Sequence, residues 1–290
     1  MSDGKYFCYL IALNRINYRN VFIVVFVLSM SSCTQKVKEQ ELSYSTNSDS
    51  ALFFYKKGWE QIMDYGAYTA AEASYRKALA YDADFLIGKS VLARLTPNLG
   101  ERLVFYKTLQ EEKHTVKGDE RLVLDVYVAL THYTNVRDQQ LPEAKEALQK
   151  ALILSEKNFG KIVHRYPEET YLKSEYIEVL HTLYGARAAL DSLNMLTTES
   201  QKSNPFLLGY KAILTAELEN YDEALGYAKE LKEILKEKHV AKTDAILADI
   251  YVKMKDYKTA KIHADKAVKI DPKNVDAGRL KKKIDSALSY

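Results

Sequence analysis

Apolar residues recur every three or four positions along most of the chain, the period at which side chains share one face of a helix. Leu247 and Tyr251 share a face of one predicted helix, and Ala260 and Ala264 share a face of the next. Small residues on the second helix let the two backbones approach closely, and Pro272 ends the pair. The pattern predicts an antiparallel helical hairpin near the C-terminus.

The same register occurs upstream, so that we expect six hairpins in all. Three spans carry the clearer copies, namely 54–84, 205–237 and 242–274, and the other three copies cover 85–112, 121–157 and 171–196. The copies lie 31 to 45 residues apart when equivalent positions of the second helices are compared. The wide spacings predict longer loops near 114–118 and 158–167. The first copy holds one extra residue in its turn.

The pattern of apolar residues in 275–290 predicts a last helix that covers the end of the stacked hairpins. Leu280, Ile284 and Leu288 form one narrow apolar stripe, whereas the lysines at 281–283 lie off it. An array of helical hairpins needs such a capping element for solubility. The alternative is a basic helix that docks onto a partner or onto lipid head groups.

The spacing of 242–274 resembles the tetratricopeptide repeat, in which Leu-Gly, Tyr, Ala and Pro recur at set positions. Leu247-Ala248, Tyr251, Ala260 and Pro272 match it, and Asp244 stands where the family has a large aromatic residue. The resemblance covers roughly 51–290. It implies an all-α fold, a right-handed α-solenoid of about six TPR-like hairpins plus the cap. It also implies a protein-binding role, with the first helix of each hairpin lining a concave face.

The N-terminus predicts export. The largely apolar run 21–30 follows Lys5, Arg15 and Arg19, and its ten residues are too few to span a bilayer as a helix, which suits a secretory signal. The sequence Leu-Ser-Met-Ser-Ser-Cys that ends at Cys33 resembles the lipobox of bacterial lipoproteins, although the family prefers Leu at Met30. The resemblance implies lipid attachment at Cys33 and cleavage before it. A short buried helix with an incidental cysteine is the alternative.

These features divide the chain into four parts. Residues 1–32 are the predicted lipoprotein signal peptide, and 33–50 are a predicted flexible tether because they contain too few apolar residues to form a core. Residues 51–274 are the repeat array, and 275–290 are the cap. We therefore expect a protein anchored to the membrane by lipid in the bacterial envelope, at the outer membrane rather than the inner one.

Charge and cysteine content exclude several classes of function. The net charge is +3, and it falls to +1 without residues 1–32, which hold three of the 42 basic and one of the 39 acidic residues. A nearly neutral body argues against nucleic-acid binding. Cys8 and Cys33 both precede the array, so neither a disulfide nor a cysteine metal site is expected within it.

Motifs for catalysis are absent from the sequence, and we predict no enzyme, no catalytic residue and no cofactor. Glu111–His114 and Glu178–His181 have the E-x-x-H spacing of di-iron bundles. Neighbouring hairpins in a solenoid do not enclose a four-helix core, so we predict no metal site. Trp59 and 22 tyrosines are compatible with a platform for sugar or peptide, but we favour tyrosine as the filler of large positions between hairpins.

The register of the first helices predicts a mixed-sign binding groove. Its expected residues are Ile87, Val91, Arg94, Tyr133, Arg137, Ser174, Glu178, His181, Tyr210, Ile213, Glu217, Asp249 and Lys253. The expected ligand is a protein or peptide partner of the cell envelope. Two other hypotheses remain open: a helical-repeat lipoprotein of outer-membrane assembly, and a glycan-capture lipoprotein, which would need a sugar-binding region for which the array leaves no room.

Overall fold

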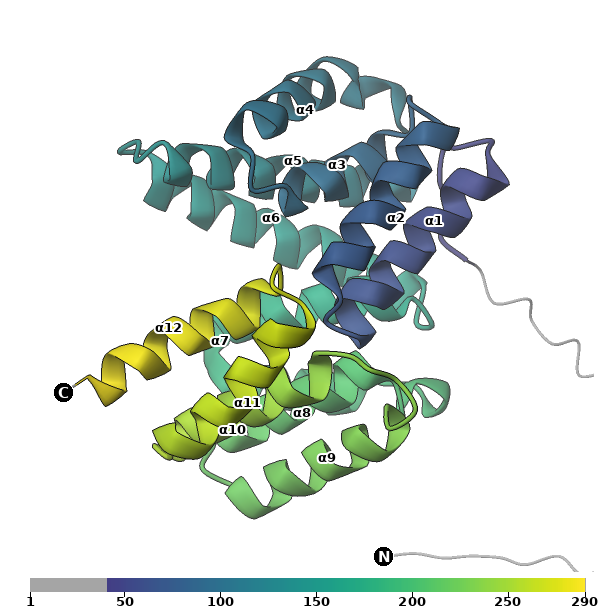
Figure 1. The fold of residues 1–290 in the computed structure, drawn as a ribbon. Coiled ribbons are helices and arrows are strands. Elements are labelled where there is room, and N and C mark those ends of the chain that lie inside the picture. Colours follow the sequence, from purple (N-terminus) through teal and green to yellow (C-terminus); the bar gives the residue numbers. More distant parts are fainter. Residues whose placement is uncertain (1–40, 290) are drawn as a thin grey trace, which may run out of the picture. The chain divides into compact units, whose positions relative to one another are not determined.

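The computed structural model describes residues 41–289, which belong to one compact unit. The predicted signal peptide, the lipobox and Cys33 lie outside these residues. Within 41–289 the chain forms twelve α-helices and no strand (Figure 1). The helices are α1 Asp49–Trp59, α2 Tyr68–Tyr81, α3 Leu86–Leu95, α4 Leu99–Glu112, α5 Gly118–Asp138, α6 Ala144–Arg165, α7 Thr170–Leu196, α8 Pro205–Glu217, α9 Tyr221–Ile234, α10 Lys242–Lys253, α11 Tyr257–Ile270 and α12 Val275–Leu288.

Consecutive helices pack as hairpins, α1 with α2, α3 with α4, α5 with α6, α8 with α9 and α10 with α11 (Figure 1). The fourth hairpin is the single element α7, which Gly185 divides into two arms by its non-helical backbone at φ +83°. Glycine adopts this conformation without the steric cost that a Cβ atom would add. The expectation of six hairpins followed by a last helix is confirmed, and with it the all-α repeat fold.

Polar side chains fix where several helices begin. Ser48, Asn98, Asn204, Asp256 and Asn274 each accept a hydrogen bond from the backbone N–H three residues further on. Such caps pair a backbone donor that the helix itself leaves free, and each is worth about 1 kcal/mol. The caps therefore set the register of α1, α4, α8, α11 and α12 locally.

The second helices approach the first through small residues, as the pattern predicts. Ala71, Ala224 and Ala260 are completely buried. The second hairpin has Arg102 at the equivalent position, and this side chain is also buried. Its guanidinium forms an ion pair with Asp138. The pair links α4 to the end of α5, so a buried ionic contact adds to the packing between the second and third hairpins.

The wide spacing of the third hairpin comes from longer helices, and the loop predicted at 158–167 is wrong. Helix α6 continues to Arg165 and has 22 residues, while α5 has 21. Phe159 and Ile162 are completely buried and continue the apolar face that Ala151 begins. Their burial extends α6 through the region expected to be a loop.

The segment 41–48 packs against the body, so the prediction of a flexible tether is wrong for residues 41–50, which include the first turn of α1. Leu42 is buried, and the ring of Tyr44 packs edge-on against Tyr55 with 5.1 Å between centroids. The backbone N–H of Ser45 donates to Glu120 at 2.8 Å. Two apolar anchors and a paired backbone donor offset the ordering entropy that the composition of this segment suggests it could not overcome.

The extra residue of the first hairpin forms a turn of π-helix, η1 Glu60–Asp64, directly after α1. A π-turn accommodates one more residue than an α-turn, so the helix continues while its last side chains change direction. Asp64 at its end is buried. Gly66 follows with φ +62° and lets the chain reverse into α2.

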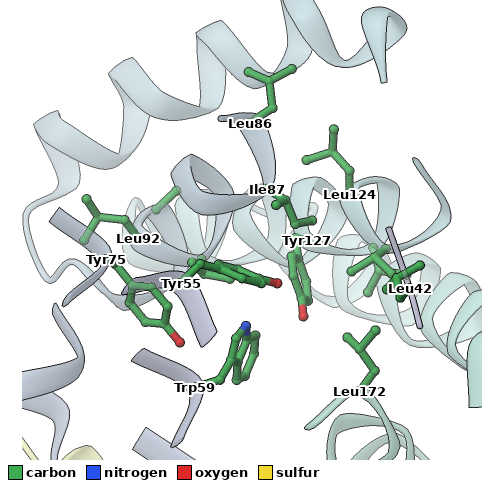
Figure 2. Packing of buried hydrophobic residues seen from close by; sticks show 14 of the residues in the cluster. Leu42, Tyr55, Trp59, Tyr75, Leu86, Ile87, Leu92, Leu124, Tyr127 and Leu172 are labelled. Carbon is green, nitrogen blue, oxygen red and sulfur yellow. The ribbon is translucent and has the colours of Figure 1, made fainter. Parts of the chain in front are cut away.

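Aromatic side chains fill the core where the first four hairpins meet (Figure 2). Tyr55, Tyr75 and Tyr127 are at most 2% exposed. Figure 2 shows Trp59 beside them, and its ring centroid lies 6.2 Å from that of Tyr127. These tyrosines act as large core residues.

Candidate functional site

The first and last hairpins of the array contact each other directly. The side-chain amide of Asn274 donates to the carbonyl oxygen of Gly66 at 2.8 Å, across 208 residues of sequence. The backbone N–H of Thr69 donates to the carboxylate of Asp271 at 3.0 Å. We call the contacts between residues 64–72 and the second half of the array the closure contacts. They were not expected from the repeat pattern, which specifies only neighbours.

Asp64 forms the closure contact with the most partners. One carboxylate oxygen accepts from the hydroxyl of Tyr171 at 2.9 Å, and the other accepts from the side chain of Asn204 at 3.0 Å. The backbone N–H of Phe206, in the first turn of α8, donates to the second oxygen at 3.3 Å. Burial raises the pKa of Asp64, while these donors favour its charged form. Asp64 therefore joins the first turn of the array to α7 and α8.

The predicted groove is partly filled by the protein itself. Ile87, Val91 and Ser174 are buried, so their expected role as groove-lining residues is wrong for this structure. The guanidinium of Arg94 lies 2.6 Å from a carboxylate oxygen of Glu175. Arg94 also lies over the ring of Tyr127, 4.5 Å from its centre, and its side chain remains 27% exposed.

Tyr133 and Arg137 interact locally on α5. The guanidinium of Arg137 lies 5.5 Å from the centre of the Tyr133 ring and pairs with Asp138 at 2.9 Å. All three residues belong to the second half of the same helix. The structure places this pair on the third hairpin, where its partners come from its own helix.

Five of the predicted residues from the last three hairpins form one connected set, which we call the polar row: His181, Tyr210, Glu217, Asp249 and Lys253. The ring nitrogens of His181 lie 2.8 Å from the hydroxyl of Tyr210 and 3.0 Å from a carboxylate oxygen of Glu217. The ammonium of Lys253 lies 3.8 Å from the other oxygen of Glu217 and 2.7 Å from Asp249. Three neighbouring first helices, α7, α8 and α10, therefore supply one row.

The polar row is accessible to solvent and bordered by aromatic rings. The side chains of Glu217 and His181 are 41% and 22% exposed. Tyr210 stacks on Phe206 with 5.5 Å between centroids, and the ammonium of Lys242 lies 4.3 Å from the Phe206 ring. Ile213, also predicted, is partly buried and packs into the core between α8 and α9.

Glu178 lies one helical turn before His181 in an unusual electrostatic setting. Burial raises its pKa to about 8, and the charges of Asp276 and Glu175 add to the shift while Lys242 and Arg94 oppose it. Asp276 belongs to α12 and accepts a hydrogen bond from the Tyr68 hydroxyl at 2.7 Å. The closure contacts thus bring a carboxylate from the end of the chain toward a carboxylate on α7.

Sequence reasoning missed Asp64, Tyr171, Lys242 and Asp276, which complete this region. The extra residue in the first turn was the one available signal for Asp64, because an insertion in a repeat marks a local departure from the shared packing. The other three residues fit their helices without any visible irregularity. Their proximity depends on contacts between distant hairpins.

The row offers hydrogen-bonding and charged side chains from three helices. Among the described residues, no group of three or more His, Cys, Asp or Glu side chains is arranged to hold a metal ion. Of the two E-x-x-H spacings, Glu178–His181 contributes its histidine to the row. In the other, a ring nitrogen of His114 lies 2.8 Å from the backbone oxygen of Glu111.

No protein-family model and no curated protein matches the chain. Among solved structures, the chain is similar to a thermophilic TPR protein from Thermus thermophilus, with 18% sequence identity and a TM-score of 0.27. The match covers 83% of this chain and 100% of the other. The hairpin architecture described above rests on this chain's own helices and their contacts.

Proposed function

We propose that this chain is a protein-binding scaffold whose binding face is the polar row. The observation that carries the proposal is the convergence of five side chains from three hairpins into one hydrogen-bonded and partly exposed set. Stacked helical repeats commonly use such extended faces to bind other proteins. Lys253 lies between the carboxylates of Glu217 and Asp249 in the row, so the row suits a polar peptide segment of mixed charge.

A photo-crosslinking amino acid placed at Tyr210 tests the proposed face in the native organism. We expect discrete adducts with one or a few proteins at position 210, because this side chain lies inside the row. Tyr184 is the matched control, since it is a tyrosine on the same α7 arm as His181 and is 57% exposed. Equal adducts at both positions would show that the row has no special role.

The double substitution Glu217→Ala and Lys253→Ala should remove the adducts at position 210. Both side chains lie in the row and both are at least 20% exposed, so we expect the helical content measured by far-ultraviolet circular dichroism to stay the same. Adducts that persist at native intensity in this variant would contradict the assignment of the row.

We further propose that the body is held at the cell envelope by lipid on Cys33, at the outer membrane rather than the inner one. The lipobox-like sequence that ends at Cys33 supports this location. No helix among residues 41–289 is both long and apolar enough to cross a membrane. Cells fed radioactive palmitate should label the native protein and leave a Cys33→Ser variant unlabelled; a labelled variant would exclude this anchor.

A further inference from the structure

A pocket of about 310 Å³ opens between the N-terminal segment, α1 and the start of α7. Its volume is at the lower end of the range for sites that hold small organic molecules, about 300–1,000 Å³. Five aromatic side chains line it: Tyr44, Tyr55, Trp59, Tyr166 and Tyr171. The segment 41–48 forms one wall, so the pocket exists because that segment is packed against the body.

The charged residues of the pocket are mainly acidic. Glu41, Glu168 and Glu169 line it, against a single cation, Lys56. Hydrogen bonds from the hydroxyls of Thr198 and Ser200 lower the pKa of Glu168, so this carboxylate is charged at neutral pH. Lys56 is 55% exposed and pairs with Glu41 at 3.5 Å, which places it at the rim. Burial raises the pKa of Glu169, an effect that the positive charge of Lys56 opposes and that a bound cation would oppose further. The lining therefore favours a positively charged ligand.

Tyr55 contributes its ring and not its hydroxyl to the lining. The hydroxyl oxygen is buried and inaccessible to solvent, and the whole residue is only 1% exposed. Figure 2 shows this ring beside Trp59, and their centroids lie 6.4 Å apart. The polar groups that a ligand can meet in the pocket are therefore the carboxylates.

We propose that this pocket binds a protonated primary amine, either a small free amine or the lysine side chain of a bound chain. Aromatic rings attract cations through their negative faces, and the attraction grows as the site is shielded from water. The carboxylates of the lining supply the opposite charge and accept hydrogen bonds from the ammonium group. This site is separate from the polar row, and its occupancy does not depend on the proposed scaffold function.

Trp59 is the only tryptophan of the chain, so its fluorescence reports directly on the pocket. Purified full-length protein is titrated with n-butylammonium chloride and with Nα-acetyl-lysine methylamide, at constant ionic strength. We expect a saturable change in Trp59 emission with at least one of them, and the tighter binder identifies a free amine or a chain-borne lysine as the source. Sodium acetate and glucose should have no saturable effect.

Two substitutions separate the predicted contacts. Glu169→Gln should weaken amine binding about tenfold, the effect of losing about 1.4 kcal/mol of interaction. Glu146→Gln is its control, because it removes an exposed carboxylate that lines a different pocket. Tyr55→Phe keeps the packing of the ring and removes a hydroxyl that is inaccessible to solvent, so n-butylammonium should bind this variant as tightly as it binds the native protein.

The proposal is overturned if neither amine gives a saturable change, or if glucose or acetate binds as well as the amines. It is also overturned if Glu169→Gln, shown to be folded by circular dichroism, binds n-butylammonium with unchanged affinity. Loss of crosslinking at the polar row would leave these results unaffected, so the two proposals fail separately.

Discussion

Replacing Asp64 with alanine should destabilise the body by about 3 kcal/mol. The substitution leaves the Tyr171 hydroxyl, the Asn204 amide and the Phe206 N–H without their acceptor. A buried donor that loses its partner costs about 1–3 kcal/mol, and we take the lower end for each of the three because water can enter beside the smaller side chain. The measurement is urea unfolding followed by circular dichroism.

The matched control for this prediction is Asp49→Ala. Asp49 is an exposed carboxylate in the first turn of α1, and its removal should cost less than about 1 kcal/mol. The loss of stability in Asp64→Asn should lie between those of Asp64→Ala and Asp49→Ala, since its remaining oxygen can still accept hydrogen bonds from Asn204 and Phe206. If the free energy of unfolding of Asp64→Ala lies within about 0.5 kcal/mol of the native value, the closure contacts contribute nothing to stability.

The free energy of unfolding should fall as the pH rises from about 4.5 to 8. Glu178→Gln should remove the part of this fall that comes from ionisation of Glu178. The pKa of Glu178 is raised from 4.5 to about 8 in the folded protein, chiefly by burial. Between these values the folded state binds a proton that the unfolded state has released, so raising the pH favours unfolding. Asp276 and Glu175 strengthen the effect, while Lys242 and Arg94 reduce it.

At pH 8 the Glu178→Gln variant should be more stable than the native protein by about 1–2 kcal/mol. One pKa unit corresponds to about 1.4 kcal/mol, and we discount the full shift because the side chain retains partial contact with solvent. At pH 4.5 the two proteins should unfold at the same urea concentration. Glu230→Gln, on an exposed position of α9, is the control and should change the pH profile little.

If the difference in unfolding free energy between Glu178→Gln and the native protein were larger at pH 4.5 than at pH 8, the predicted pH dependence would have the opposite sign. It would mean that the charged form of Glu178 is favoured in the folded protein, so that Lys242 and Arg94 outweigh burial. That result would also mean that Asp276 of α12 does not act on Glu178, because Asp276 is the carboxylate that the closure contacts bring toward it.

The sequence alone predicted the hairpins because their signals are local. Helix periodicity, a small residue such as Ala260 and a stop such as Pro272 lie within one repeat, and each acts on its immediate neighbours. Projection of the same register onto α7, α8 and α10 also selected His181, Tyr210 and Lys253. These residues do meet, since neighbouring first helices pack in sequence order.

The same projection failed for Ile87, Val91 and Ser174, which are buried. Repeat periodicity specifies which face of a helix a residue occupies, but not what covers that face. In the second and fourth hairpins the cover is an aromatic core and an ion pair between Arg94 and Glu175. The sequence could not predict this cover, because the rings come from several hairpins at once.

The amino-acid sequence by itself thus predicted the hairpins and selected the side chains of the polar row, since both follow from interactions within a repeat or between adjacent repeats. It did not predict how far α6 continues, because the burial of Phe159 and Ile162 depends on the other helices around them. Only the tertiary structure decided the closure contacts. Asp64 reaches Tyr171 across 107 residues, and Asn274 reaches Gly66 across 208. Small rotations between successive hairpins add up over such distances, and no local pattern encodes their sum. The same reason explains why the pocket between the N-terminal segment, α1 and α7 appears only in the folded chain.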